Sequence, residues 1–165
     1  MGDVNRYRHG NRQLVQVPVA SATVIEKGDF VVLSSGKAST PAALKAQASE
    51  GTSKKNVLNA LMQNFVGIAE TPSASGDTDD ILVDVSTDAV FEFTQSSAAD
   101  LSFGDMVEIY AYSTASSSWT ARDQSVASGS DNPVAVCVRD HDSAKGTGVL
   151  CRLLPQKLLG AASWT

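Results

Sequence analysis

The sequence predicts a mainly β protein: a small antiparallel β-barrel or sandwich with one inserted α-helix and an extended N-terminal arm. Short runs of apolar and β-branched residues, bounded by Gly, Asp and Ser, are typical of strands and turns. Only one stretch has sustained helical spacing. A Gly-Asp pair opens two similar segments, "KGDFVVLSSG" from residue 27 and "FGDMVEIYAY" from residue 103. The length of 165 residues fits a single domain, and residues 14–155 are its expected body.

Residues 1–13 are the predicted arm, which is polar and basic. Arg6, Arg8 and Arg12 stand there against one acidic residue, Asp3. In an extended segment these three arginines point to one side, where they could line an acidic groove or where the backbone could add to a sheet edge. A disordered tail and an arm folded on its own acidic body are the alternatives. Because ordering the segment costs backbone entropy, we expect it to be mobile until a partner binds.

The first part of the body alternates predicted strands and turns. Residues 14–25 form an edge or broken strand, because Pro18 removes a ladder donor. Residues 30–33 form the next strand. An insertion of about residues 41–64 follows, and its residues 53–64 form a helix with Ser53 as N-cap. The apolar positions of this helix, which we expect to close one open end of a barrel, are Val57, Leu58, Leu61, Met62 and Phe65.

Strands continue to residue 155, and residues 156–165 form a short tail. Residues 65–70 form a buried strand. In residues 81–93 the odd positions are apolar except for Thr87, and Asp84, Asp88 and Glu92 are even, so the odd face is predicted to be inside. "STD" at 86–88 is predicted to form a turn or bulge within this strand of residues 81–93. Residues 106–112, 133–140 and 148–155 are further strands, the last two joined as a hairpin.

The two Gly-Asp segments each begin a repeated order. Each is followed by a strand of small residues and then by a β-branched strand after a glycine-containing loop. Glycine permits a turn at positive φ, and the Asp side chain can bond the backbone of the turn. Neither segment is a phosphate-binding loop, because no Lys-Ser/Thr pair and no helix follow the glycine.

This order resembles a family of small bacteriophage capsid cement proteins, also called head decoration proteins. The similarity covers about residues 14–155. The matching residues are Gly28-Asp29-Phe30-Val31, Val66-Gly67-Ile68-Ala69, Gly104-Asp105-Met106-Val107, Pro133-Val134-Ala135-Val136 and Gly146 to Leu153. The resemblance implies a small β-barrel on the outside of an icosahedral head, often a trimer, that holds neighbouring major capsid proteins together. The insertion at 34–64 and Cys137 depart from the family pattern.

Motifs for catalysis or metal binding are weak, so we expect no enzymatic activity and no cofactor. "RDHD" at 139–142 could orient a base, but it lies at a predicted hairpin tip and is read as a solvent-facing loop. "SGDTDD" at 75–80 lacks the glycine that an EF-hand loop requires. Cys137 and Cys151 are predicted to have opposite parities, so we expect two reduced thiols.

Charge and aromatic residues suggest where partners bind. No basic residue lies between Lys55 and Arg122, whereas that interval holds ten acidic residues, so a nucleic acid partner is not expected. No apolar run is long enough for a membrane span. Tyr110 and Tyr112 share one side of a strand and form either an interface patch or a packed barrel end. The predicted binding residues are therefore Arg6, Tyr7, Arg8, Arg12, Tyr110 and Tyr112.

Two function classes remain at this point. The first is a structural virion protein, made in the host cytoplasm, that binds the major capsid protein and neighbouring copies of itself as a homotrimer on the outer capsid surface. The second is a β-rich binding module, such as a carbohydrate-binding or adhesion domain on a phage tail or cell surface. An exposed aromatic platform would favour the second, and the two tryptophans, Trp119 and Trp164, form no convincing one.

Overall fold

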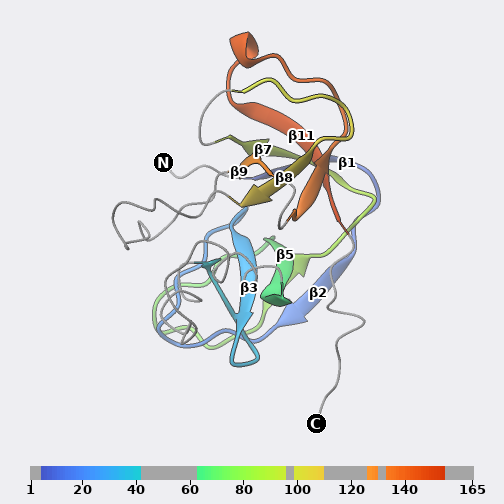
Figure 1. The fold of residues 1–165 in the computed structure, drawn as a ribbon. Helices are drawn as coiled ribbons and strands as arrows, with labels where there is room; N and C mark the ends of the chain where they lie inside the picture. The colour runs from blue at the N-terminus through green and yellow to red at the C-terminus, as the bar shows by residue number, and fades with distance from the viewer. Residues whose placement is uncertain (1–4, 42–62, 96–98, 110–125, 130–132, 155–165) are drawn as a thin grey trace, which may run out of the picture.

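The computed structural model describes residues 5–41, 63–95, 99–109, 126–129 and 133–154. These residues form two antiparallel sheets, which lie one above the other in Figure 1. The mainly β prediction is confirmed. The prediction of a barrel is wrong, because neither sheet closes on itself. The predicted helix falls almost wholly outside the described residues, and Phe65, its last apolar position, begins a strand instead.

The lower sheet in Figure 1 has the strand order β2-β6-β5-β3-β4. Its strands are β2 (Leu14–Val17), β3 (Phe30–Ser34), β4 (Lys37–Ser39), β5 (Phe65–Ala69) and β6 (Ile81–Asp84). We call residues 14–84 the N-terminal repeat. β2 is at the edge of this sheet, as Pro18 predicts.

The upper sheet has the order β1-β7-β11-β10-β8-β9. Its strands are β1 (Arg6–His9), β7 (Val90–Thr94), β8 (Met106–Ile109), β9 (Val126–Ser128), β10 (Ala135–Cys137) and β11 (Gly148–Leu153). We call residues 90–153 the C-terminal repeat. A short 3₁₀ turn, η1 (Ser143–Lys145), lies within the hairpin predicted between β10 and β11.

The two repeats have the same topology and the same register. The strand order β2-β6-β5-β3-β4 of the N-terminal repeat corresponds, strand by strand, to the order β7-β11-β10-β8-β9 of the C-terminal repeat. The pair Leu14–Asp84 takes the place that Val90–Arg152 takes in the other sheet. An isolated parallel bridge joins Val19 to Ala38, and its counterpart joins Gln95 to Val126. The internal repeat read from the sequence is therefore confirmed in the pairing of each strand.

The Gly-Asp turns are alike as well. Gly28 and Gly104 have φ values of 90° and 92°, in the left-handed region that favours glycine. The Asp29 carboxylate accepts the backbone N–H of Glu26 at 2.8 Å, and the Asp105 carboxylate accepts that of Ser102 at 2.8 Å. The predicted turn chemistry is thus confirmed in both repeats.

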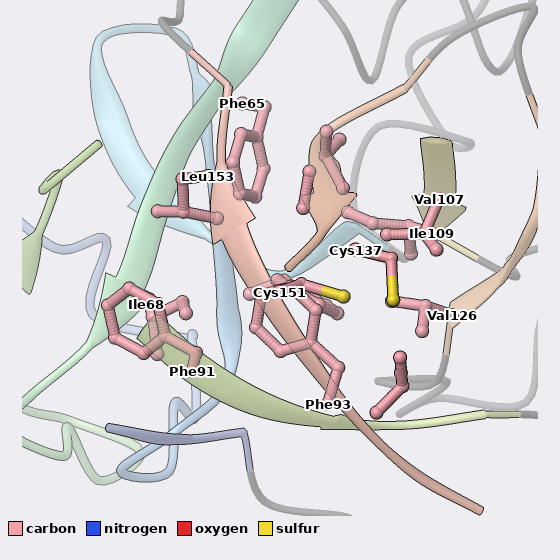
Figure 2. Close-up of a cluster of buried hydrophobic side chains, with 14 of the residues drawn as sticks. Phe65, Ile68, Phe91, Phe93, Val107, Ile109, Val126, Cys137, Cys151 and Leu153 are labelled. Carbon is pink, nitrogen blue, oxygen red and sulfur yellow. The ribbon is translucent and has the colours of Figure 1, made fainter. Parts of the chain in front are cut away.

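Among the described residues, two apolar clusters form the core. One is built within the N-terminal repeat, around Val31, Val66 and Val83. The other fills the C-terminal repeat and takes in side chains of the N-terminal repeat, so the repeats share it. Figure 2 shows Ile68 of the N-terminal repeat beside Phe91 of the C-terminal repeat, and Phe65 near Leu153, in this shared cluster.

The predicted strand of residues 81–93 is two strands in different sheets. β6 ends at Asp84, and β7 begins at Val90 in the other repeat. Within β6 and β7 the odd positions are buried as predicted, whereas Thr87 between the two strands is exposed. Asp84, which was expected to face water, is only 1% exposed. The alternation rule fails there because the outward side of β6 is covered by the chain around Arg12.

Candidate functional site

The predicted arm is part of the folded body from residue 5 to residue 13. β1 pairs antiparallel with β7, with Arg6 opposite Glu92 and Tyr7 opposite Phe91. The backbone of Gln13 pairs with that of Val85 at 2.9 Å. The expectation of an arm that is mobile in the free protein is therefore wrong for these residues. Among the alternatives that the sequence left open for residues 1–13, the structure agrees with a segment that folds on the acidic body of its own chain.

The three arginines do not form one strip, because the register shifts between Tyr7 and His9. Arg8 pairs with Glu92 and lines one hollow. Arg6 and Arg12 line another hollow, of about 420 Å³, together with Tyr7. An even spacing predicts a common side only where the strand is regular, and this strand is not.

Arg12 joins three parts of the chain. Its guanidinium lies over the Tyr7 ring, 4.7 Å from the centroid. Its Nε donates to Asp84 at 2.6 Å and a terminal nitrogen donates to Glu70 at 2.5 Å. Lys27 Nζ also reaches Glu70, at 2.8 Å. Arg12 therefore makes internal contacts that hold the N-terminal segment against β6 and against Glu70, the residue that follows β5.

The hydrogen bonds of this cluster shift its proton affinities. The hydrogen bond with Glu70 is the largest cause of a raised pKa of Arg12, and Asp84 adds to it. The hydrogen bond from Arg12 is likewise the main cause that lowers the pKa of the Glu70 carboxyl, against partial burial. Both groups are therefore held in their charged forms.

Tyr7 is the one predicted binding residue on β1 with an apolar surface. Its ring meets Phe91 edge-on at 6.2 Å, and its hydroxyl donates to the Gly10 carbonyl at 2.7 Å. The side chain remains 38% exposed. Tyr110 and Tyr112 lie outside the described residues.

Cys137 and Cys151 are cross-strand neighbours, which corrects the parity argument. They pair directly between β10 and β11, and both are buried in the shared cluster (Figure 2). The error arose from taking Arg139 as a guide to the face of Cys137, although β10 ends at Cys137. Both thiols are free, and the Cys137 thiol donates to the Arg139 carbonyl at 2.9 Å. The hydrogen bond with Cys137, together with burial, raises the pKa of the Cys151 thiol.

The "RDHD" stretch has side chains that hold loop backbone. Asp140 accepts the N–H of Phe103 at 2.7 Å, and Asp142 accepts that of Ala144 at 2.9 Å at the start of η1. His141 Nε2 lies 3.0 Å from the Gly146 carbonyl. The Asp140 bond ties the β10–β11 loop to the second Gly-Asp turn, and the other two contacts hold the loop itself.

Asp77, in the acidic loop, caps its own turn by accepting the N–H of Ala74 at 2.9 Å. Within the described part of the chain, no group of three or more His, Cys, Asp or Glu side chains is placed to hold a metal ion. In that same part, no helix is long and apolar enough to cross a membrane.

A further surface, which the sequence patterns did not predict, lies on the outward side of β7, β11, β10 and β8. Two adjoining hollows, of about 560 and 460 Å³, lie along the β7 and β11 part of this surface, and they share His9, Arg139 and Leu150. Phe103 stands at the edge of this surface and is 73% exposed. The available signal was the basic group Arg139, Lys145 and Arg152, which follows the long interval without basic residues between Lys55 and Arg122.

No protein-family model matches the chain, and no curated protein matches it in sequence.

Proposed function

We propose that this chain is a structural virion protein that binds the outside of a phage capsid and reinforces contacts between major capsid proteins. The proposal depends mainly on where the structure places the residues that resemble the cement proteins. The two Gly-Asp turns occupy corresponding positions in the two repeats, where they precede β3 and β8. The strands that pair with β3 and β8, which are β5 and β10, also correspond. The pattern shared with the cement proteins is thus the framework of the whole fold rather than one loop.

The surface chemistry also supports a binding role. The described residues of the outward β7–β8 side combine exposed apolar side chains with arginines, a mixture that is typical of protein interfaces. Under this proposal the chain acts through shape and surface contacts, as copies that join neighbouring capsid proteins and one another, with a homotrimer as the proposed assembly.

The direct test is the copy number of the chain in purified particles of the phage that encodes it. Quantitative mass spectrometry should find a number close to that of the shell protein. A particle map should then place the density outside the shell, with three copies around one axis. Absence from particles, or a few copies at a tail, would contradict the proposal and favour an adhesion module.

A capsid-binding assay should use point variants rather than removal of residues 2–13. The truncation would delete β1 and the Arg12 contacts, so lost binding could simply reflect unfolding. Arg6→Glu is better suited, because Arg6 is exposed and makes no ion pair among the described residues. If Arg6 contacts the capsid, this variant should bind more weakly and with a smaller salt dependence, whereas Lys37→Glu, an exposed control on β4, should not.

A further inference from the structure

The N-terminal repeat packs on the C-terminal repeat through one face of its sheet. Phe30 and Ile68 lie on that face, opposite one another on β3 and β5, and are 0% and 3% exposed. The Phe30 ring meets Phe93 of the C-terminal repeat edge-on, at 5.3 Å between centroids. This face is buried because the next repeat along the chain covers it.

The same face of the C-terminal repeat is open. By register, Met106 and Val136 take the places of Phe30 and Ile68. Met106 is 44% exposed and Val136 is half-buried. The described part of the chain therefore presents a second version of a face that it already uses as an interface, and none of its described strands covers this second version.

The surroundings of Met106 and Val136 have the composition of an interface. Val138 and Leu150, both half-buried, continue the apolar surface, and the exposed Phe103 lies beside them in one hollow. Arg139 and Arg152 line the same hollow. We name this surface the open face: Phe103, Met106, Val136, Val138 and Leu150, with Arg139 and Arg152.

We propose that the open face binds the N-terminal repeat of a second copy of this chain, in the same head-to-tail sense in which the N-terminal repeat packs on the C-terminal repeat within one chain. Two observations select this occupant. The first is the register match, which makes the covered face and the open face versions of one surface. The second is charge: the open face carries Arg139 and Arg152, whereas the N-terminal repeat exposes Asp77, Asp79 and Asp80.

The register match between the two repeats also indicates which surface of the second copy contacts the open face. Within one chain Phe30 lies against Phe93, next to Phe91 on the same side of β7. The register matches of Phe91 and Phe93 on β2 are Val15 and Val17, and Val15 is only half-buried. The contact joins unlike surfaces, so it either closes into a ring or extends as a chain of copies.

Sedimentation equilibrium of the free protein over a range of concentrations tests the contact. We expect self-association that Met106→Glu and Arg152→Glu each weaken about tenfold or more in dissociation constant, because each sets a negative charge against an acidic or apolar surface. Both positions are exposed, so circular dichroism and unfolding should show intact folding. Lys37→Glu is the matched control: it is also exposed and changes a positive to a negative charge, and it should leave the dissociation constant unchanged.

Cross-linking tests the head-to-tail sense. Met106→Cys places one exposed thiol on the open face, and Gln13→Cys places one on the side of β2 that carries Val15, because Gln13 extends the β2–β6 register opposite Val85. The native cysteines are buried. A short bismaleimide should give a dimer band when the two variants are mixed, and none with either variant alone or with the parent protein.

Three outcomes would overturn the proposal. They are a monomeric mass at the highest soluble concentration, a cross-link within Met106→Cys alone, and Met106→Glu or Arg152→Glu variants that lose capsid binding but keep their self-association. The last would assign the open face to the capsid protein. Because the contact is measured in free solution and does not rest on the proposed function, failure of the capsid proposal would leave this result standing.

Discussion

At the scale of single residues, Arg12 is the side chain on which the N-terminal segment depends most. Asp84 is 1% exposed and Arg12 is its charged partner. Replacing Arg12 by Ala leaves this carboxylate buried without a compensating charge, so we expect the free energy of unfolding to fall by about 2–4 kcal/mol. Arg8→Ala removes an exposed pair and should cost about 1 kcal/mol or less. Urea denaturation of both variants measures the difference, and equal losses would refute this role for Arg12.

Glu70 makes stability depend on acid. Its pKa in the folded protein lies below the ordinary value of 4.5, mainly because Arg12 donates to it. The stabilisation is therefore complete above pH 4.5 and is lost as the pH falls through the lower, folded-state pKa. We expect the urea concentration at the midpoint of unfolding to decrease as the pH is lowered below 4.5. The decrease should be less steep in Glu70→Gln than in the parent protein. A variant with the same pH dependence as the parent protein would show that other carboxylates dominate.

At the scale of elements, the two Gly-Asp turns make a matched pair for mutation. Asp29 is buried and Asp105 is exposed, although both accept a backbone N–H at 2.8 Å. We expect Asp29→Ala to cost about 1–3 kcal/mol, since the unpaired donor is partly buried, and Asp105→Ala about 1 kcal/mol or less, since water can replace the carboxylate. Guanidinium denaturation gives both values. The reverse order would mean that burial does not decide the cost.

The elements also show how far the sequence alone could lead. The β class, the edge position of β2, the β10–β11 hairpin and the repeat were predictable, because each depends on local turn chemistry and alternation. The place of β7 in the second sheet was not, because residues 86–88 have the appearance of a turn or bulge within a single strand. The docking of β1 was not either: it depends on Asp84 and Glu70, which lie far from Arg12 in sequence. The open face requires the register of four strands, which no local pattern encodes.

At the scale of the whole molecule, the shared core predicts that the two repeats unfold together. Phe30 lies within this core and meets Phe65 and Phe93 edge-on. Phe30→Leu loses these ring contacts and should lower the free energy of unfolding by about 1–2 kcal/mol. Native-state hydrogen exchange should then show the same loss of protection in β3 and in β11.

Phe103→Leu is the control for this experiment, because Phe103 is exposed and its loss should change stability by about 0.5 kcal/mol or less. Loss of protection confined to β2–β6 in Phe30→Leu would mean that the repeats unfold as separate units.

The matching register of the two repeats has a consequence for refolding. A chain that carries two strands with the same pairing pattern can place β6 where β11 belongs, or can exchange strands with another copy, which is a characteristic failure of repeat proteins. The sequences differ at the positions that would expose such an error. Asp84 of β6 stands where β11 has Arg152, so an exchanged β6 would bring a carboxylate beside Val90 with no arginine such as Arg12 to receive it. We therefore expect Asp84→Asn to refold with more strand-exchanged dimer than the parent protein at high concentration, because the substitution removes the charge that rejects the wrong neighbour.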